Sequence, residues 1–181
     1  MEINDSEILN QLKKLENFEA GFKSLVHKYQ EPLYWHIRRM VHFHEDSNDI
    51  LQNVFIKVYK GIHSFREDSK LYTWLYRIAT NESLNFLKKN KMKFDGSVDH
   101  LIGLKEDPYF SGDQIQYYLK LAIEQLPTKQ KQVYIMRYYD ELPYQSISEI
   151  VVTSVGALKA SYHHAVKKIE NYLKETDVFA S

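Results

Sequence analysis

The sequence predicts an all-α protein with two small helical domains, an N-terminal helical bundle and a C-terminal helix-turn-helix, joined by an acidic linker. Almost every segment places its apolar residues at the three- and four-residue spacings of an amphipathic helix, and no stretch alternates as a strand would. Glycine and proline are scarce, with 6 and 4 copies in 181 residues. Residues 92–112 interrupt the helical pattern. They separate a predicted first domain, residues 1–91, from a second, residues 113–181.

Composition limits the classes of protein to which the chain could belong. A hydrophobic share of 44% with 27% charged residues is that of a folded globular protein. No apolar run is long enough to span a bilayer, and the acidic start MEINDSEILN does not resemble a signal peptide. The chain has no cysteine, which excludes disulfides and thiolate metal sites. These features predict a soluble, cytoplasmic protein without a membrane segment.

The charge balance bears on nucleic-acid binding. The formal net charge is zero, from 24 Lys/Arg and 24 Asp/Glu. A protein that binds DNA on its own gains affinity by releasing counterions, which requires a surplus of cations. If this chain meets DNA, we therefore expect a larger partner to supply much of the affinity.

Three helices are expected before residue 42. Ser6 can cap the first, with Asp5 and Glu7 near its positive end. Its apolar residues are Ile8, Leu12 and Leu15. The second is expected over residues 18–29. Pro32 suits the first turn of a third helix, because its missing N–H is unpaired there anyway. The apolar face of this third helix consists of Leu33, Ile37, Met40 and Val41.

Two further helices complete the first domain. Ser47 is expected to cap the fourth helix. Its apolar stripe comprises Ile50, Leu51, Val54, Phe55, Val58 and Ile62. Gly61 and residues 65–69 separate it from a fifth helix that starts near Leu71. Four or five amphipathic helices of this length can bury one common core.

The fifth helix carries the most informative pattern. Its apolar stripe is Leu71, Leu75, Ile78 and Ala79. The adjacent flank holds residues at i, i+4, i+7 and i+11, namely Lys70, Trp74, Arg77 and Asn81. Cations follow phosphates, aromatic rings stack on bases and amides bind base edges, so this flank could hold a single nucleic-acid strand. A core tryptophan beside solvated polar residues is the other interpretation, and the pattern alone favours it.

The second domain shows the helix-turn-helix pattern. Residues 111–114 resemble a capping box that opens a helix ending at Pro127, and Thr128 is expected to cap the next. Pro143 opens a short helix, and a tight turn at 152–154 leads into a last long helix. A short helix, a three-residue turn and a longer helix are typical of this motif.

In such motifs the N-terminal part of the second helix enters the major groove. The side of that helix expected to face solvent carries Ser154, Ala157, Lys159, Ala160, Ser161, His163 and His164. These residues are the candidates for duplex contact. A helix-turn-helix that serves only for packing is the alternative.

No pattern indicates an enzyme or a metal site. His42 and His44 lie beside two acids, but residues two apart on a helix point about 200° apart, so a solvated helix end is expected. His163 and His164 are adjacent and diverge likewise. The sequence contains no glycine-rich phosphate loop, nucleophile elbow or paired-carboxylate pattern. We expect no catalytic residue, no metal and no cofactor.

Three stretches resemble one protein family. FREDSKLYTWLYRIATN resembles the promoter-melting segment of bacterial sigma factors of the extracytoplasmic-function (ECF) group, and DILQNVFIKVYKGIHSF resembles their polymerase-binding segment. Residues 122–169 are similar to their C-terminal promoter-binding domain along its whole length. The resemblance implies a factor that directs core RNA polymerase to promoter DNA and assists melting. The first domain would recognise the minus-ten strand and the second the minus-thirty-five duplex.

The resemblance also implies roles for individual residues. Asp49, Gln52 and Phe55 become candidates for docking on polymerase, although Phe55 is better explained as a core residue. The candidates for holding the melted non-template strand are Lys70, Tyr72, Trp74, Arg77 and Asn81. An anti-sigma partner is common in this group, and nothing in the sequence names one. Residues 92–112 are either a plain spacer or a segment that contacts polymerase.

The second domain departs from the family pattern. Val152 and Thr153 stand where the family commonly has a glycine and an aliphatic residue. Residues 157–161 read Ala-Leu-Lys-Ala-Ser where Thr-Val-Lys-Ser-Arg is frequent, and His164 replaces a frequent arginine. Arginine is the best guanine-binding side chain and a strong phosphate contact, so we expect weak or unusual duplex contacts here.

Two other classes of protein remain as alternatives. A DNA-binding regulator whose helix-turn-helix works alone predicts salt-sensitive duplex binding by the isolated chain. A helical adaptor without a DNA role predicts no DNA dependence even with polymerase present. Neither alternative requires the flank of Lys70, Trp74, Arg77 and Asn81, which makes that flank the discriminating feature. The sequence does not give the promoter sequence, the genes controlled or the inducing signal.

Overall fold

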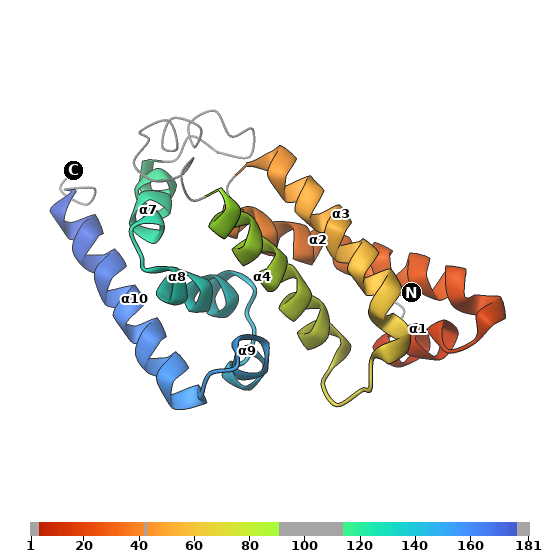
Figure 1. The fold of residues 1–181 in the computed structure, drawn as a ribbon. Helices are drawn as coiled ribbons and strands as arrows, with labels where there is room; N and C mark the ends of the chain where they lie inside the picture. Colours follow the sequence, from red (N-terminus) through yellow and green to blue (C-terminus); the bar gives the residue numbers. More distant parts are fainter. Residues whose placement is uncertain (1–3, 42, 91–113, 177–181) are drawn as a thin grey trace. The chain divides into compact units, whose positions relative to one another are not determined.

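A computed structural model describes residues 4–41, 43–90 and 114–176 (Figure 1). In these ranges the regular structure is entirely helical, which confirms the predicted all-α class. The chain divides into two compact units between Lys88 and Lys89. The tether predicted for residues 92–112 lies outside the described residues, and so do the first three residues of the capping box predicted at 111–114.

The first unit is built from α-helices with two short 3₁₀ turns. Their bounds are α1 (Asp5–Leu12), η1 (Leu15–Asn17), α2 (Phe18–Val41), α3 (His44–Gly61), η2 (Ile62–Ser64) and α4 (Leu71–Lys89). The core of the unit consists of fully buried side chains from all four α-helices, among them Ile8, Leu25, Leu33, Ile37, Val54 and Leu75.

The prediction that a new helix starts at Pro32 is wrong. α2 runs without a break from Phe18 to Val41 with Pro32 inside it. An interior proline costs about 3 kcal/mol. Here Tyr29, Leu33 and Ile37 continue the buried stripe in phase across it. Each buried apolar side chain contributes roughly 1.5–3 kcal/mol, so burial of this stripe outweighs the cost of the proline.

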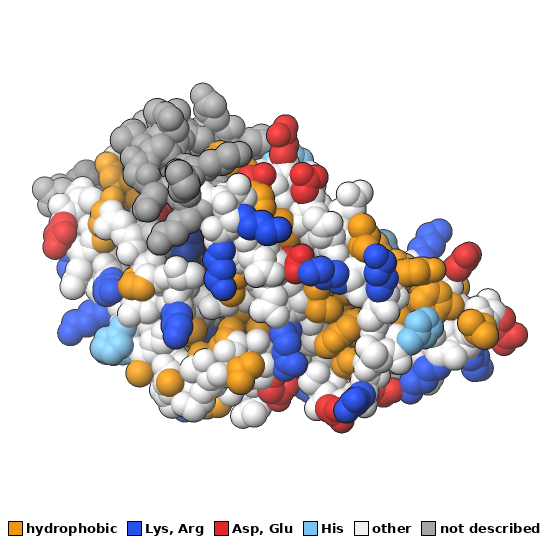
Figure 2. All heavy atoms as spheres, in the orientation of Figure 1, with side chains coloured by type: hydrophobic (Ala, Val, Ile, Leu, Met, Phe, Trp, Pro, Cys, Tyr) orange, Lys and Arg blue, Asp and Glu red, His pale blue; other side chains and the backbone are white. Residues whose placement is uncertain are grey.

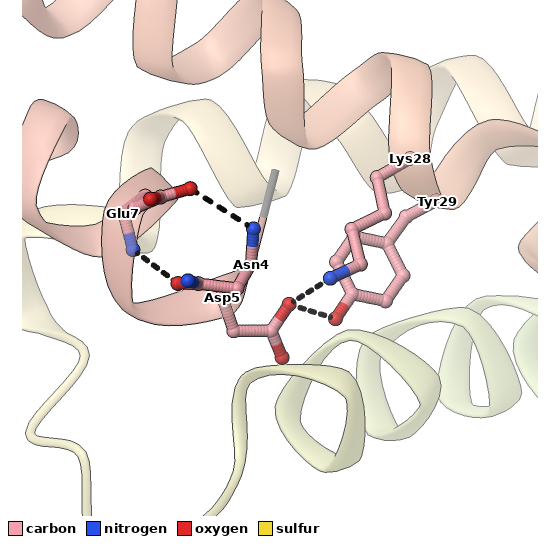
Figure 3. A network of polar contacts seen from close by, with 5 residues as sticks. All are labelled: Asn4, Asp5, Glu7, Lys28 and Tyr29. Carbon is pink, nitrogen blue, oxygen red and sulfur yellow. Dashed lines mark hydrogen bonds and ion pairs between the residues drawn. The ribbon is translucent and has the colours of Figure 1, made fainter. Parts of the chain in front are cut away.

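The predicted N-terminal caps are also wrong. α1 is capped by Asn4 rather than Ser6: the Glu7 N–H donates to Asn4 Oδ1 over 2.8 Å, and the Asn4 N–H donates to Glu7 Oε2 over 3.3 Å (Figure 3). Ser47 lies within the first turn of α3, where its hydroxyl donates to the Phe43 carbonyl over 2.6 Å. Leu15, predicted among the apolar residues of the first helix, lies beyond α1 in η1 and is 93% exposed.

Three contacts fix α1 on α2. Asp5 Oδ1 accepts hydrogen bonds from Lys28 Nζ and from the Tyr29 hydroxyl, both over 2.7 Å (Figure 3). Burial, and then the hydrogen bond to Asp5, raise the pKa of Tyr29, so its phenol remains a donor. At Gly21 the helices approach so closely that a Cβ would lie 2.8 Å from Gln11 Cβ.

The second unit places a long C-terminal helix against the helices that precede it. Its elements are α7 (Gln114–Glu124), α8 (Thr128–Tyr134), the π-helical turn η3 (Ile135–Tyr139), α9 (Tyr144–Val151) and α10 (Val155–Glu175). α10 packs against α7, α8 and α9. One core cluster of this unit comprises Ala122, Ile123, Leu126, Tyr134, Ala165 and Ile169. Thr128 is the first residue of α8 and makes no side-chain cap, contrary to the prediction.

Candidate nucleic-acid interface

The predicted flank of α4 lies outside the buried stripe of that helix. Leu71, Leu75 and Ala79 face the core with at most 2% of their surface exposed. Lys70 and Asn81 are exposed, whereas Trp74 and Arg77 are half-buried. The helix thus presents two cations, an indole and an amide along one side, and Trp74 is not sealed in the core.

The Trp74 indole packs beside two neighbours. Its ring centroid lies 5.2 Å from that of Phe65, with the two planes tilted by 37°. It also approaches Gly61 at the end of α3, where an added Cβ would lie 3.5 Å from the ring. Trp74 nevertheless remains only half-buried. A packed but partly exposed ring is suited to stacking on a base.

The loop between η2 and α4 is held in an unusual backbone conformation. Glu67 has a φ of 59°, in the left-handed region that favours glycine. Its carboxylate forms an ion pair with Lys13, just after α1. At the end of the loop, Lys70 Nζ lies 5.8 Å from the centre of the Tyr72 ring. Thus two residues predicted to hold a DNA strand, Lys70 and Tyr72, contact each other.

α4 is anchored to α2 by a buried histidine that the sequence analysis did not single out. His36 is fully buried, and its Nε2 lies 2.9 Å from the Thr80 hydroxyl. Its ring also meets the Tyr76 ring edge-on, with centroids 5.0 Å apart. Burying polar groups is favourable only when they are paired, so this contact fixes α4 on α2. Thr80 precedes Asn81 directly, and the anchor therefore sets the direction in which Asn81 points.

The candidate polymerase-docking residues lie on α3. Asp49 and Gln52 are exposed and one turn apart, while Phe55 is half-buried. Further along the helix, Ile56 and Tyr59 are 46% and 51% exposed, although they are large apolar residues. The sequence analysis did not single out these two.

The helix-turn-helix forms with the predicted three-residue turn. Val152 ends α9 in the left-handed conformation with a φ of 52°. Ser154 caps α10, since its Oγ accepts a hydrogen bond from the Ala157 N–H over 3.3 Å. Most of the predicted duplex-contacting residues are exposed on α10 or at its cap, and Ser161 is half-buried. The exposed ones are Ser154, Ala157, Lys159, Ala160, His163 and His164.

Lys159 belongs to a cation–aromatic group that the sequence analysis missed. Its Nζ lies 6.0 Å from the centre of the Tyr144 ring, and Arg137 Cζ lies 5.3 Å from the same ring. Arg137 also donates to the Leu142 carbonyl over 3.3 Å. Because these residues come from η3, α9 and α10, no sequence spacing signals the group. It brings two cations to the start of the helix-turn-helix.

The histidine and acid cluster at residues 42–46 forms no metal site in the described part of the chain. His44 uses both ring nitrogens for protein contacts: Nδ1 lies 2.7 Å from the Tyr34 hydroxyl and Nε2 lies 3.0 Å from Asn48 Nδ2. His42 lies outside the described residues. Across the described ranges, no group of three His, Asp or Glu side chains could hold a metal ion. In the same ranges, no helix is both long and apolar enough to cross a membrane.

Val152 offers a test of the turn. We expect Val152→Gly to raise the free energy of unfolding of the second unit by about 1 kcal/mol. A β-branched residue with positive φ costs of order 1–3 kcal/mol, and glycine removes this strain. Part of the gain is lost because glycine has more conformational entropy in the unfolded chain. Its side chain is 85% exposed, so little packing is lost. Thermal melting of the full chain measures the change. Val152→Ala, which retains a Cβ, is the control and should raise the free energy of unfolding much less.

Comparison with known families places each unit. Residues 25–92 match the family described as Sigma-70 region 2, and residues 117–169 match Sigma-70, region 4. RNA polymerase sigma-H factor of Pseudomonas aeruginosa is 31% identical, with 86% of this chain and 88% of the relative aligned. ECF RNA polymerase sigma factor SigW of Bacillus subtilis is 29% identical, with 97% and 100% aligned. ECF RNA polymerase sigma-E factor of Escherichia coli K12 is 30% identical, with 84% and 86% aligned.

Two solved structures share the fold. CnrH, in complex with the cytosolic domain of CnrY, superposes with a TM-score of 0.72 at 16% identity, covering 94% of this chain and 99% of that one. The sigma factor RpoE of Bartonella quintana, in complex with the anti-sigma factor NepR, gives 0.67 at 20% identity, covering 84% and 96%. At these identities the likeness concerns the fold alone.

Proposed function

The chain belongs to the ECF group of RNA polymerase sigma factors, and we propose how its residues divide the work of promoter recognition. As a member of this family it directs RNA polymerase to promoters in transcription initiation, and it is not an enzyme. It binds RNA polymerase and DNA. The residue-level assignments that follow are proposals.

The α4 flank holds the melted non-template strand of the minus-ten element and so assists melting. The observation that carries this proposal is the placement of Trp74, packed beside Phe65 and Gly61 but partly accessible, on the same side of α4 as exposed Lys70 and Asn81. Unstacking a base costs a few kcal/mol, and stacking on an aromatic ring returns roughly 1–3 kcal/mol per base. Asn81 provides the amide that can bind the exposed base edge.

The second unit binds the minus-thirty-five duplex with the exposed side of α10. Lys159 and Arg137 share the Tyr144 ring, which supports a role in holding phosphates near the start of the motif. His164 stands where the family frequently has an arginine, a stronger DNA-binding side chain, so most of the affinity is assigned to polymerase. This division of labour agrees with the zero net charge.

We also infer where the chain works and what controls it. Polymerase and promoter DNA are its partners, so its site of action is the cytoplasm. Because RpoE of Bartonella quintana has been solved with the anti-sigma factor NepR, we propose that an anti-sigma factor can bind this chain as well. Residues 1–91, 92–112 and 113–181 are proposed as the strand-binding domain, the linker and the duplex-binding domain.

Run-off transcription tests the proposed function. Core polymerase from a related bacterium is combined with a genomic library, with and without the purified chain. We expect discrete new start sites only when the chain is present. Sequencing of the transcripts then identifies the promoter DNA for the experiments below. Transcripts that do not depend on the chain would contradict the proposal.

Asp49→Arg tests polymerase docking. Asp49 is exposed on α3, and we expect the reversed charge to weaken association with core polymerase at least tenfold, because charge reversal at an interface replaces attraction by repulsion. Co-purification and anisotropy of the labelled chain measure the affinity. Glu45→Arg, an exposed acid in the first turn of the same helix, is the matched control. If Asp49→Arg co-purifies with core polymerase as well as the wild type does, Asp49 is not part of the interface.

A further inference from the structure

The loop between η2 and α4, residues 65–70, is joined to α1 by an ion pair. Lys13, the residue that caps the end of α1, pairs with Glu67 in the middle of the loop. The backbone of Lys13 is fixed on α1, because its N–H donates to the Leu9 carbonyl over 3.1 Å. In Figure 2, acidic and basic side chains lie beside one another where Figure 1 shows this loop, at the lower edge of the view. We call this contact the Lys13–Glu67 pair.

A hollow of about 210 Å³ lies between α1 and the loop. Side chains of both sides line it, among them Leu9, Leu12 and Lys13 from α1 and its cap, and Ile62, Phe65 and Glu67 from η2 and the loop. Close packing would hold the loop by itself, whereas a hollow leaves room for the loop to shift. The Lys13–Glu67 pair joins the two walls and therefore restricts such a shift.

The backbone of the loop is strained at the residue that forms the pair. Glu67 has a φ of 59°, and a residue other than glycine is unfavourable in this conformation. Strain of this kind persists only where the surrounding structure holds the residue in place. The pair acts on the side chain of the strained residue, so it is suited to hold the loop in this conformation.

The loop leads directly to the residues proposed to bind the DNA strand. Phe65, at its start, packs beside Trp74 with ring centroids 5.2 Å apart. Lys70, at its end, is a proposed strand contact, and its carbonyl accepts a hydrogen bond from the Trp74 N–H over 3.2 Å. A shift of the loop would therefore displace two neighbours of Trp74 together.

We propose that Lys13 is a positioning residue for strand binding. By pairing with Glu67 it holds the loop beside Trp74 in the conformation that receives the melted minus-ten strand, and it does not contact the DNA itself. This inference rests on the proposed strand-binding role of α4. It gives a function in promoter opening to a residue outside the family match, which begins at residue 25.

Promoter opening tests this role, with holoenzyme formed at saturating core polymerase. 2-Aminopurine in the minus-ten element of a promoter found by run-off transcription reports the opening. Lys13→Ala and Glu67→Ala should each lower the equilibrium constant for opening about two- to fivefold at low salt, the range that exposed ion pairs contribute. The two side chains are 61% and 46% exposed, so salt should screen the pair and reduce the difference from the wild type.

Further variants separate positioning from other roles. Alanine at both positions should be no worse than alanine at one, because both side chains act through one contact. The exchanged pair, Lys13→Glu with Glu67→Lys, should restore most of the opening. Lys14→Ala removes an exposed charge at the next position and should behave as the wild type does. Thermal melting and affinity for core polymerase should not change in any of these variants, which separates positioning from folding.

Four results would overturn the inference. Wild-type opening by Lys13→Ala and Glu67→Ala, with Trp74→Ala impaired, refutes this inference alone. Additive losses in the double alanine variant show that the two residues act separately. If Lys13→Ala weakens opening and Glu67→Ala strengthens it, Lys13 contacts a DNA phosphate and does not act through Glu67. If Trp74→Ala is unimpaired, the proposed strand binding fails together with this inference.

Discussion

Trp74→Ala is expected to reduce promoter opening by holoenzyme about 5- to 150-fold. This range corresponds to the loss of roughly 1–3 kcal/mol of base–aromatic stacking. A base analogue such as 2-aminopurine, placed in the minus-ten element, fluoresces when unstacked and reports opening directly. Association with core polymerase should be unchanged, because the proposed docking residues Asp49 and Gln52 lie on α3 rather than on α4.

Two controls separate stacking from folding in this experiment. Trp74 also packs on Phe65 and beside Gly61, so thermal melting must show that the variant is folded. Trp74→Phe retains a ring and should recover most of the opening. Asn81→Ala removes an exposed amide without disturbing the core, and we expect it to reduce opening strongly as well. Normal opening by both alanine variants would refute the strand-binding role of α4.

Gly21→Ala is expected to destabilise the first unit by about 1–3 kcal/mol, the usual cost of overpacking. Its new Cβ would lie 2.8 Å from Gln11 Cβ and 3.0 Å from the Leu12 backbone nitrogen. Backbone atoms cannot rotate away, so α1 must move off α2. Thermal or urea unfolding of the full chain, followed by signals from each unit, measures the loss.

Gly156→Ala is the matched control for this prediction. Gly156 lies in the first turn of α10, and no heavy atom lies within 4 Å of an added Cβ. Alanine is favoured over glycine in a helix by up to about 1 kcal/mol, so this variant should be slightly stabilised. The same chemical change thus has opposite expected signs at the two positions. Equal effects at both would show that α1 does not pack on α2 as closely as described.

The sequence was sufficient to predict which residues share a helix face, because that arrangement follows from a periodic pattern. Spacing alone predicted that the residues of the α4 flank share one side of the helix, because a helix places i, i+4 and i+7 together whatever surrounds it. Their strand-binding role was predicted from the family resemblance. The same rule explains why α2 continues through Pro32: its buried residues remain in phase. What the pattern could not give is where α1 and α3 begin. Ser6 and Ser47 are good capping residues that lie one or more positions inside their helices.

Features that depend on tertiary contact were not predictable. The buried pair of His36 and Thr80 joins residues 44 positions apart, and no spacing links them. The left-handed conformations of Glu67, Glu141 and Val152 were equally hidden, since none is a residue type that prefers positive φ.

The contact of α1 with α2 has a practical consequence for anyone who isolates the first unit. The family match begins at residue 25, which lies in the middle of α2. A fragment cut at that boundary would lose α1 together with the amino-terminal turns of α2, and with them the carboxylate that Lys28 and Tyr29 share. Leu25, which is fully buried in the intact chain, would be exposed at the new N-terminus. A fragment intended to remain soluble and folded should therefore begin before Asn4.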